Sequence, residues 1–142
     1  MTTLGLIEGV IDAEALARAC RTDAHGAVVT FLGTTRETSP GDVRPVAALE
    51  YEAYAVMAER EIRAIADETE RRWGPLRIAM VHRIGRVELG EASVAVIVAA
   101  GHRGMAFDAC RYAIDALKAR VPIWKREIYR DGDAAWVANA VG

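Results

Sequence analysis

The chain contains only two lysines, and they lie close together on either side of a Val-Pro turn. Of its 18 basic residues, 16 are arginines, and the two lysines are Lys118 and Lys125. A lysine that is desolvated or beside another cation can lose its proton and act as an acid, base or nucleophile, whereas an arginine in practice cannot. The pair is therefore our first candidate for catalysis, although chance alone can also produce such a spacing.

Lys118 falls on a predicted helix from about Met105 to Arg120. At ~100° per residue, one face of this helix is an apolar stripe made of Phe107, Cys110, Ile114 and Leu117. Lys118 and Arg111 border the stripe, so both cations lie beside the predicted core. The alternative is that their long stems cover apolar surface while their charged groups reach water. Cys110, inside the stripe, is predicted to be an inert core thiol.

Lys125 falls on a predicted strand that begins near Ile123. The alternation of a strand places Lys125 and Glu127 on one face, and Arg126 on the other face with Trp124. The alternative to a functional role for these charges is an ordinary ion pair on a solvated face.

Two short loops have the composition of an anion site. Gly33-Thr34-Thr35-Arg36 follows a predicted strand, where small residues let backbone N–H groups approach an anion and Arg36 offers a planar fork. Gly101-His102-Arg103-Gly104 precedes the helix of Lys118, so backbone N–H groups, an imidazole and a guanidinium meet at a helix start. The alternatives are a solvated Arg36 and a His102 that only caps the helix.

Other polar residues are better explained by structure. His82 is in phase with the apolar residues of its strand, which favours a core histidine, and Glu50 with Glu52 is the polar face of another strand. The two cysteines, Cys20 and Cys110, form neither a metal quartet nor a disulfide framework. Asp, Glu and His do not cluster at a metal-ligand spacing, so we expect no metal and no bound cofactor.

The elements that must position these residues follow from periodicity and from turn signals. Asp12 is placed to cap the first helix, and Gly74-Pro75 ends the second. In chain order we predict helix 12–21, strand 26–33, a loop at 37–42, strand 47–54, helix 56–73, strand 76–84, a central strand 92–100, helix 105–120, and a hairpin of 123–130 with 134–139. This order indicates an α+β fold: a single domain over residues 1–142, with a mixed or antiparallel sheet, two main helices in an α/β-hammerhead-like arrangement and hairpin additions.

Length and charge narrow the function class. A chain of 142 residues, 52% of them hydrophobic, suits one folded domain, and a net charge of −2 gives no global field that draws a protein onto nucleic acid or acidic membrane. The N-terminus lacks the pattern of a secretory signal, and the longest apolar run, Ala92 to Gly101, is about half of the ~20 residues that a membrane helix needs. We expect a cytoplasmic protein without nucleic-acid or membrane partners.

Five ordered motifs, read together, resemble the catalytic (large) subunit family of molybdopterin synthase over nearly the whole chain. They are GAVVTFLGTTR, LEYEAYAVMAE, HRIGRVELGE, GHRGMAFDACRYAIDALK and VPIWKREIYRDGDAAW. The resemblance implies an enzyme that sulfurates cyclic pyranopterin monophosphate to form the dithiolene of molybdopterin. It also implies that the sulfur arrives as a thiocarboxylate on the C-terminal Gly-Gly of a small ubiquitin-like carrier, and that this chain forms a homodimer within a heterotetramer.

By motif, the resemblance assigns catalysis to Lys118 and Lys125. It assigns substrate binding to Thr34, Thr35, Arg36, His102, Arg103, Arg126 and Glu127. Thr34-Thr35 replaces residues that are often larger in the family. The chain carries no fused ubiquitin-like sequence and ends in Val141-Gly142, so the carrier is expected to be a separate chain.

Two other functions fit the basic loops. One is a non-catalytic regulatory domain that binds an anion or nucleotide, which needs cations but no lysine in particular. The other is an assembly subunit whose strands pair with partner chains while the basic residues hold a peptide carboxylate.

Overall fold

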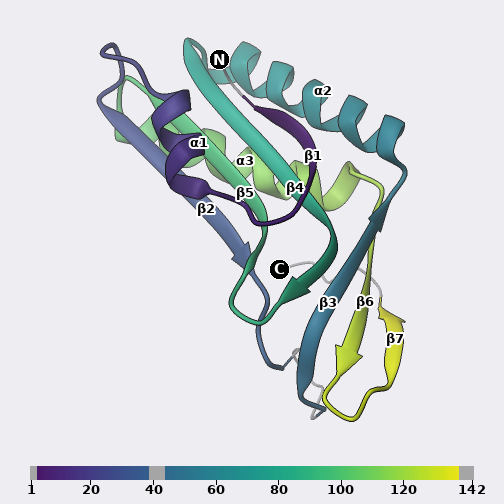
Figure 1. Cartoon of the computed structure of the whole chain (residues 1–142). Coiled ribbons are helices and arrows are strands. Elements are labelled where there is room, and N and C mark those ends of the chain that lie inside the picture. The colour runs from purple at the N-terminus through teal and green to yellow at the C-terminus, as the bar shows by residue number, and fades with distance from the viewer. Residues whose placement is uncertain (1–2, 39–43, 138–142) are drawn as a thin grey trace.

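The computed structural model describes residues 3–38 and 44–137, which form three helices and a seven-stranded sheet (Figure 1). In chain order the elements are β1 (Leu4–Glu8), α1 (Ala13–Cys20), β2 (Ala27–Thr34), β3 (Val46–Ala53), α2 (Ala55–Trp73), β4 (Leu76–Glu88), β5 (Ala92–Ala100), α3 (Arg103–Arg120), β6 (Ile123–Tyr129) and β7 (Ala134–Val137).

The sheet is mixed. Its strands follow the order β2-β5-β4-β3-β6-β7, and every neighbouring pair along this path is antiparallel. β1 lies off the path and pairs in parallel with β4. The predicted α+β class, the mixed sheet with two main helices and the C-terminal hairpin are therefore confirmed.

The helices cover both faces of the sheet (Figure 1). α2 and α3 pack on one face, where Ile62 and Ile65 of α2 meet Ile78, Met80 and other buried residues of the sheet. α1 covers the other face, where Leu16, Ala17 and Cys20 contact Ala79, Ile97 and Ala99. β5 is thus enclosed on both faces, and eight of its nine residues are buried, as expected for its continuous apolar run.

A bend in β4 changes which residues face the α2–α3 core. Before the bend the even-numbered residues Ile78, Met80 and His82 point to this side, whereas after it Val87 does. Gly85 lies between them with φ +88°, a conformation that residues with a Cβ rarely adopt. The part of β4 before Gly85 pairs with β5, and the part from Gly85 onward pairs with β3, so the bend joins the two halves of the sheet.

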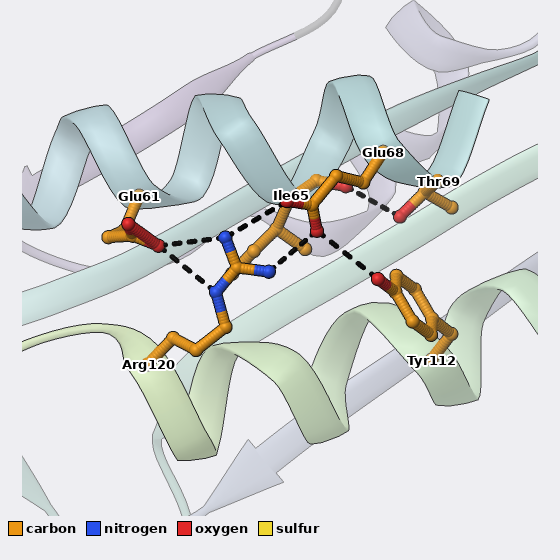
Figure 2. Close-up of polar contacts among 6 residues, drawn as sticks. All are labelled: Glu61, Ile65, Glu68, Thr69, Tyr112 and Arg120. Atoms are coloured by element: carbon orange, nitrogen blue, oxygen red, sulfur yellow. Dashed lines mark hydrogen bonds and ion pairs between the residues drawn. The ribbon is translucent and has the colours of Figure 1, made fainter. Parts of the chain in front are cut away.

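α2 and α3 are also linked by charged side chains (Figure 2). Arg120 at the end of α3 reaches across to α2, with 3.0 Å to Glu61 and 2.6 Å to Glu68, and the hydroxyl of Tyr112 donates to Glu68 at 3.1 Å. Within α2, the Thr69 hydroxyl donates to the carbonyl of Ile65 at 2.7 Å, which satisfies this buried polar group. These contacts fix the end of α3, from which Lys118 extends.

Most predicted elements are confirmed to within a few residues, and Asp12 caps α1 by accepting a hydrogen bond from the N–H of Ala15 at 3.0 Å. Two features differ from the prediction. β1 was not predicted, and Phe107, predicted in the buried stripe of α3, is 61% exposed. Alanines form the buried face instead, together with Cys110 and Leu117. Residues 39–42 of the predicted loop and residues 138–139 of the predicted hairpin lie outside the described residues.

Candidate active site

Lys118 and Lys125 line the same small cavity, although one lies on α3 and the other on β6. The cavity has a volume of about 20 Å³, which is enough for one water molecule. It is lined by Tyr51, His82, Leu117, Lys118, Val121, Ile123 and Lys125. The cavity lies where the bend of β4 brings the two halves of the sheet under the end of α3, and the structure thus brings together the two residues that composition singled out.

The surroundings of Lys118 favour its neutral form. Burial of its side chain lowers the pKa of the amine, and the nearby positive charge of Lys125 lowers it further. Lys118 nevertheless keeps exposed surface, so its desolvation is partial and a ligand can still reach it. A lysine with a lowered pKa beside a second lysine is an arrangement suited to proton transfer and to the stabilisation of negative charge.

His82 closes one side of the cavity from β4. Only 2% of its surface is exposed, its Nδ1 donates to the carbonyl of Arg83 at 2.8 Å, and its ring meets that of Tyr51 edge-on at 4.8 Å between centroids. Burial lowers its pKa to about 4, with a smaller contribution from the charge of Lys118. The prediction of a core histidine is confirmed, and the ring is neutral at physiological pH.

β6 separates the charged residues that follow Lys125. Glu127 shares the face of Lys125 and is only 3% exposed, so the alternative of a solvated ion pair on this face is wrong. Arg126 lies on the opposite face, where it pairs with Glu50 of β3 at 2.9 Å. Arg126 is therefore turned away from the side of the sheet on which Lys118 and Lys125 meet.

The Thr34-Thr35-Arg36 segment leaves the end of β2. Thr35 is buried, and its backbone is held by the loop before β5: its N–H donates to the Glu91 carbonyl at 3.1 Å, and its carbonyl accepts from the N–H of Gly90 at 2.8 Å. Thr34 and Arg36 are exposed. An incoming ligand can therefore meet the side chains of Thr34 and Arg36 more readily than that of Thr35.

His102 and Arg103 lie far from the lysines of the same chain. Both are exposed, His102 is the N-cap residue of α3 without a capping hydrogen bond from its side chain, and Arg103 is the first residue of the helix. Lys118 follows Arg103 by 15 residues along α3, so a rise of 1.5 Å per residue separates them by about 22 Å. Thr34 pairs with Ala92 at the start of β5, so it lies about 26 Å along the strands from Ala100, the end of β5 that precedes His102 and Arg103. One chain therefore does not gather all the predicted substrate residues.

The remaining candidates do not add to the cavity. Arg111 is exposed on α3 and lies 3.7 Å from Asp115. Both cysteines are buried, and burial raises the pKa of each thiol, that of Cys110 to about 11. Over the ranges 3–38 and 44–137, no three His, Cys, Asp or Glu side chains are grouped as a metal ion would require.

Sequence reasoning missed Tyr51 as part of the site. Its position opposite Lys125 in the β3–β6 pairing places both side chains on one face of the sheet. The alternation of β3 predicted which face Tyr51 takes, but the register between β3 and β6 is not visible in the sequence.

Comparison with known proteins identifies the family. Residues 6–120 match the family model described as "MoaE protein". The chain belongs to the MoaE family.

Two relatives illustrate the range of MoaE-family sequences to which the chain is similar. A protein of Thermoplasma volcanium named "Molybdopterin synthase catalytic subunit" is 52% identical over 119 residues, which cover 84% of this chain and 85% of the relative. A protein of Bos taurus with the same name is 49% identical over 114 residues, which cover 80% of this chain but 59% of the relative. The chain thus spans less than two thirds of the length of its mammalian MoaE relatives.

A solved structure of the same family has the same fold. The structure titled "The X-ray Crystal Structure of Molybdopterin Synthase from Staphylococcus aureus" superposes with a TM-score of 0.90 at 35% identity, covering 97% of this chain and 98% of that one. In the described part of this MoaE-family chain, none of the helices combines the length and apolarity needed to cross a bilayer.

Proposed function

We propose that this chain is the catalytic subunit of a molybdopterin synthase, which transfers sulfur to cyclic pyranopterin monophosphate in molybdenum cofactor biosynthesis. The observation that carries the proposal is the meeting of the only two lysines of the chain at one cavity, where burial and the charge of Lys125 lower the pKa of Lys118. The names of the relatives support the same activity.

The sulfur comes from a partner. A cysteine that carries sulfur must be accessible and readily deprotonated, whereas Cys20 and Cys110 are buried and their pKa values are raised. A small ubiquitin-like carrier with a C-terminal thiocarboxylate supplies the sulfur from outside instead. The word "subunit" in the names of the relatives agrees with such a partner.

The two lysines have different roles in this reaction. The thiocarboxylate sulfur forms a bond to a side-chain carbon of the pterin while a carbon–oxygen bond at that carbon breaks, so negative charge develops on the departing oxygen. Lys125 stabilises this charge as an ammonium ion, and Lys118, whose pKa is lowered, transfers the proton. Water then hydrolyses the resulting thioester, which leaves the sulfur on the pterin and a carboxylate on the carrier. Arg36 with Thr34 holds the substrate phosphate from the end of β2, and the buried Thr35, bonded to the loop before β5, positions this segment.

The substrate site requires a second copy of the chain. His102 and Arg103 lie about 22 Å from Lys118 in the same chain, which is too far for one small molecule to span. In a homodimer these two residues serve the lysines of the other copy. One carrier bound to each copy then gives a heterotetramer.

Reconstitution tests the activity. The chain is mixed with a thiocarboxylated carrier and the cyclic pterin, and the dithiolene product is measured by mass spectrometry. We expect Lys118→Ala to abolish product formation, and Lys118→Arg, which keeps the charge but cannot exchange a proton, to lower the rate by about 10²–10⁴-fold. Arg111→Lys, an exposed change on the same helix, is the matched control and is expected to leave the rate unchanged.

Normal turnover of Lys118→Arg would refute the proton-transfer role. A regulatory domain that only binds an anion would tolerate this substitution. An assembly subunit would bind the carrier but form no dithiolene with the unaltered chain.

A further inference from the structure

The two ring nitrogens of His82 have different surroundings. A carbonyl oxygen can only accept a hydrogen bond, so the contact of 2.8 Å between Nδ1 and the Arg83 carbonyl requires the proton to be on Nδ1. Because the buried ring is neutral, Nε2 then carries a lone pair. The sequence predicted only the burial of this residue, and the tautomer follows from the structure.

With Nδ1 bonded to the Arg83 carbonyl, Nε2 is the ring nitrogen that remains available to a group in the cavity. Tyr51 packs against the ring edge-on, Nδ1 is directed to its own strand, and His82 lines the same cavity as Lys118 and Lys125. The cavity has room for one water molecule.

The side chains around the cavity beside His82 come from three elements. Tyr51 comes from β3, Lys125 from β6 and Lys118 from α3. Arg83, the next residue on β4, is directed to Glu91, with 3.2 Å between the charged groups. Lys118 and His82 line the same small cavity, and the charge of Lys118 lowers the pKa of the imidazole.

We propose that His82 is a positioning residue for Lys118: its Nε2 accepts a hydrogen bond from the ammonium group, directly or through one water in the cavity, and so holds the amine beside Lys125. A neutral acceptor can do this without adding charge to a site that must stabilise an anion. The inference rests on the proposed function, in which Lys118 transfers a proton, but the contact itself can be tested without turnover.

The low number of lysines makes a direct test possible. With lysine labelled with ¹³C at Cε, each copy of the chain gives two side-chain signals, and Lys118→Arg assigns them. His82→Phe keeps the packing but removes the acceptor, and His82→Gln places an amide oxygen near the position of Nε2. We expect the pKa of Lys118 to fall by about one pH unit in His82→Phe, because its ammonium form loses a hydrogen bond, and to return close to the native value in His82→Gln.

The catalytic rate should change in parallel with the pKa of Lys118: kcat should be about tenfold or more lower in His82→Phe and close to the native value in His82→Gln. His25→Phe is the matched control, because His25 lies beside Thr22 and away from the cavity, and it should leave the Lys118 signal unmoved. An unchanged pKa of Lys118 in His82→Phe, or an equal fall in both His82 variants, would overturn the proposal.

A second measurement does not depend on the folding of a His82 variant. Long-range ¹H–¹⁵N spectra of the imidazoles report the tautomer of His82 and the hydrogen bonding of Nε2. Lys118→Met removes the amine but keeps most of the stem, so the Nε2 resonance of His82 should move, and an unmoved resonance would refute the contact. If the native chain shows this contact but forms no dithiolene, the proposed function fails while the positioning role stands.

Discussion

Burial of the neutral His82 predicts that the fold loses stability as the pH falls below neutrality. The pKa of this histidine drops from 6.5 to about 4 on folding. At pH values between these two, the unfolded chain binds a proton that the folded chain does not, so the free energy of unfolding decreases as the pH falls. The contribution is fully present above pH 6.5 and is lost as the pH falls to about 4, below which this histidine has no further effect.

The size of the effect follows from the difference between the two pKa values. At about 1.4 kcal/mol per pH unit, the whole difference corresponds to about 3 kcal/mol, of which about 2 kcal/mol is lost between pH 7 and pH 5. Most carboxylates remain ionised over this narrower range, so the histidine term can be separated from acid denaturation.

Urea unfolding followed by circular dichroism measures this loss. The experiment compares the native chain with His82→Gln at both pH values and at one protein concentration. Glutamine does not titrate, so the variant should lack this part of the pH dependence, whatever its stability at pH 7. Equal losses of stability in the two proteins would refute the reasoning, because His82 would then have the same pKa in the folded and unfolded chains.

Two further outcomes test the buried thiols and the core. Cys20 and Cys110 are buried and their pKa values are raised, so iodoacetamide at about pH 8 should modify neither thiol in the native protein. In denaturing guanidinium it should modify both, and mass spectrometry measures the modification. Rapid modification of the native protein would contradict the burial of the thiols. Ile62→Ala truncates a fully buried side chain of α2 and should lower the free energy of unfolding, measured in the same urea assay, by about 2–5 kcal/mol. Val56→Ala, at an exposed position of the same helix, is the control and should change this free energy by less than about 0.5 kcal/mol.

Local signals predicted most of the elements because each element carries its own pattern. Asp12 caps α1, Gly74-Pro75 follows the end of α2, and the alternation of β3 is clear in the sequence. β1 was missed because its five residues include a glycine and its pairing with β4 is parallel and distant in sequence. The same limit applies to Tyr51, whose proximity to Lys125 depends on the register between two strands.

The buried face of α3 shows how a size-based interpretation fails. Large apolar residues predicted a stripe that included Phe107, but the face against the sheet is formed by Ala106, Ala109 and Ala113 with Cys110 and Leu117. Small side chains let the helix approach the strands closely, which a hydrophobic pattern does not reveal. The separation of His102 and Arg103 from Lys118 is different, because it follows from the length of α3, which the sequence predicted; the motif resemblance assigned all three residues to one substrate site without regard to this length.

The bend at Gly85 also limits how this chain can change in length during evolution. The side chains that face the α2–α3 core switch between His82 and Val87, so one residue added or removed there would turn the rest of β4 to the opposite face or shift its pairing with β3. Since β6 takes its register from β3, Lys125 would move with them, although it is distant in sequence. Insertions and deletions between homologous chains are therefore expected in the loops and at the termini rather than in this stretch of β4.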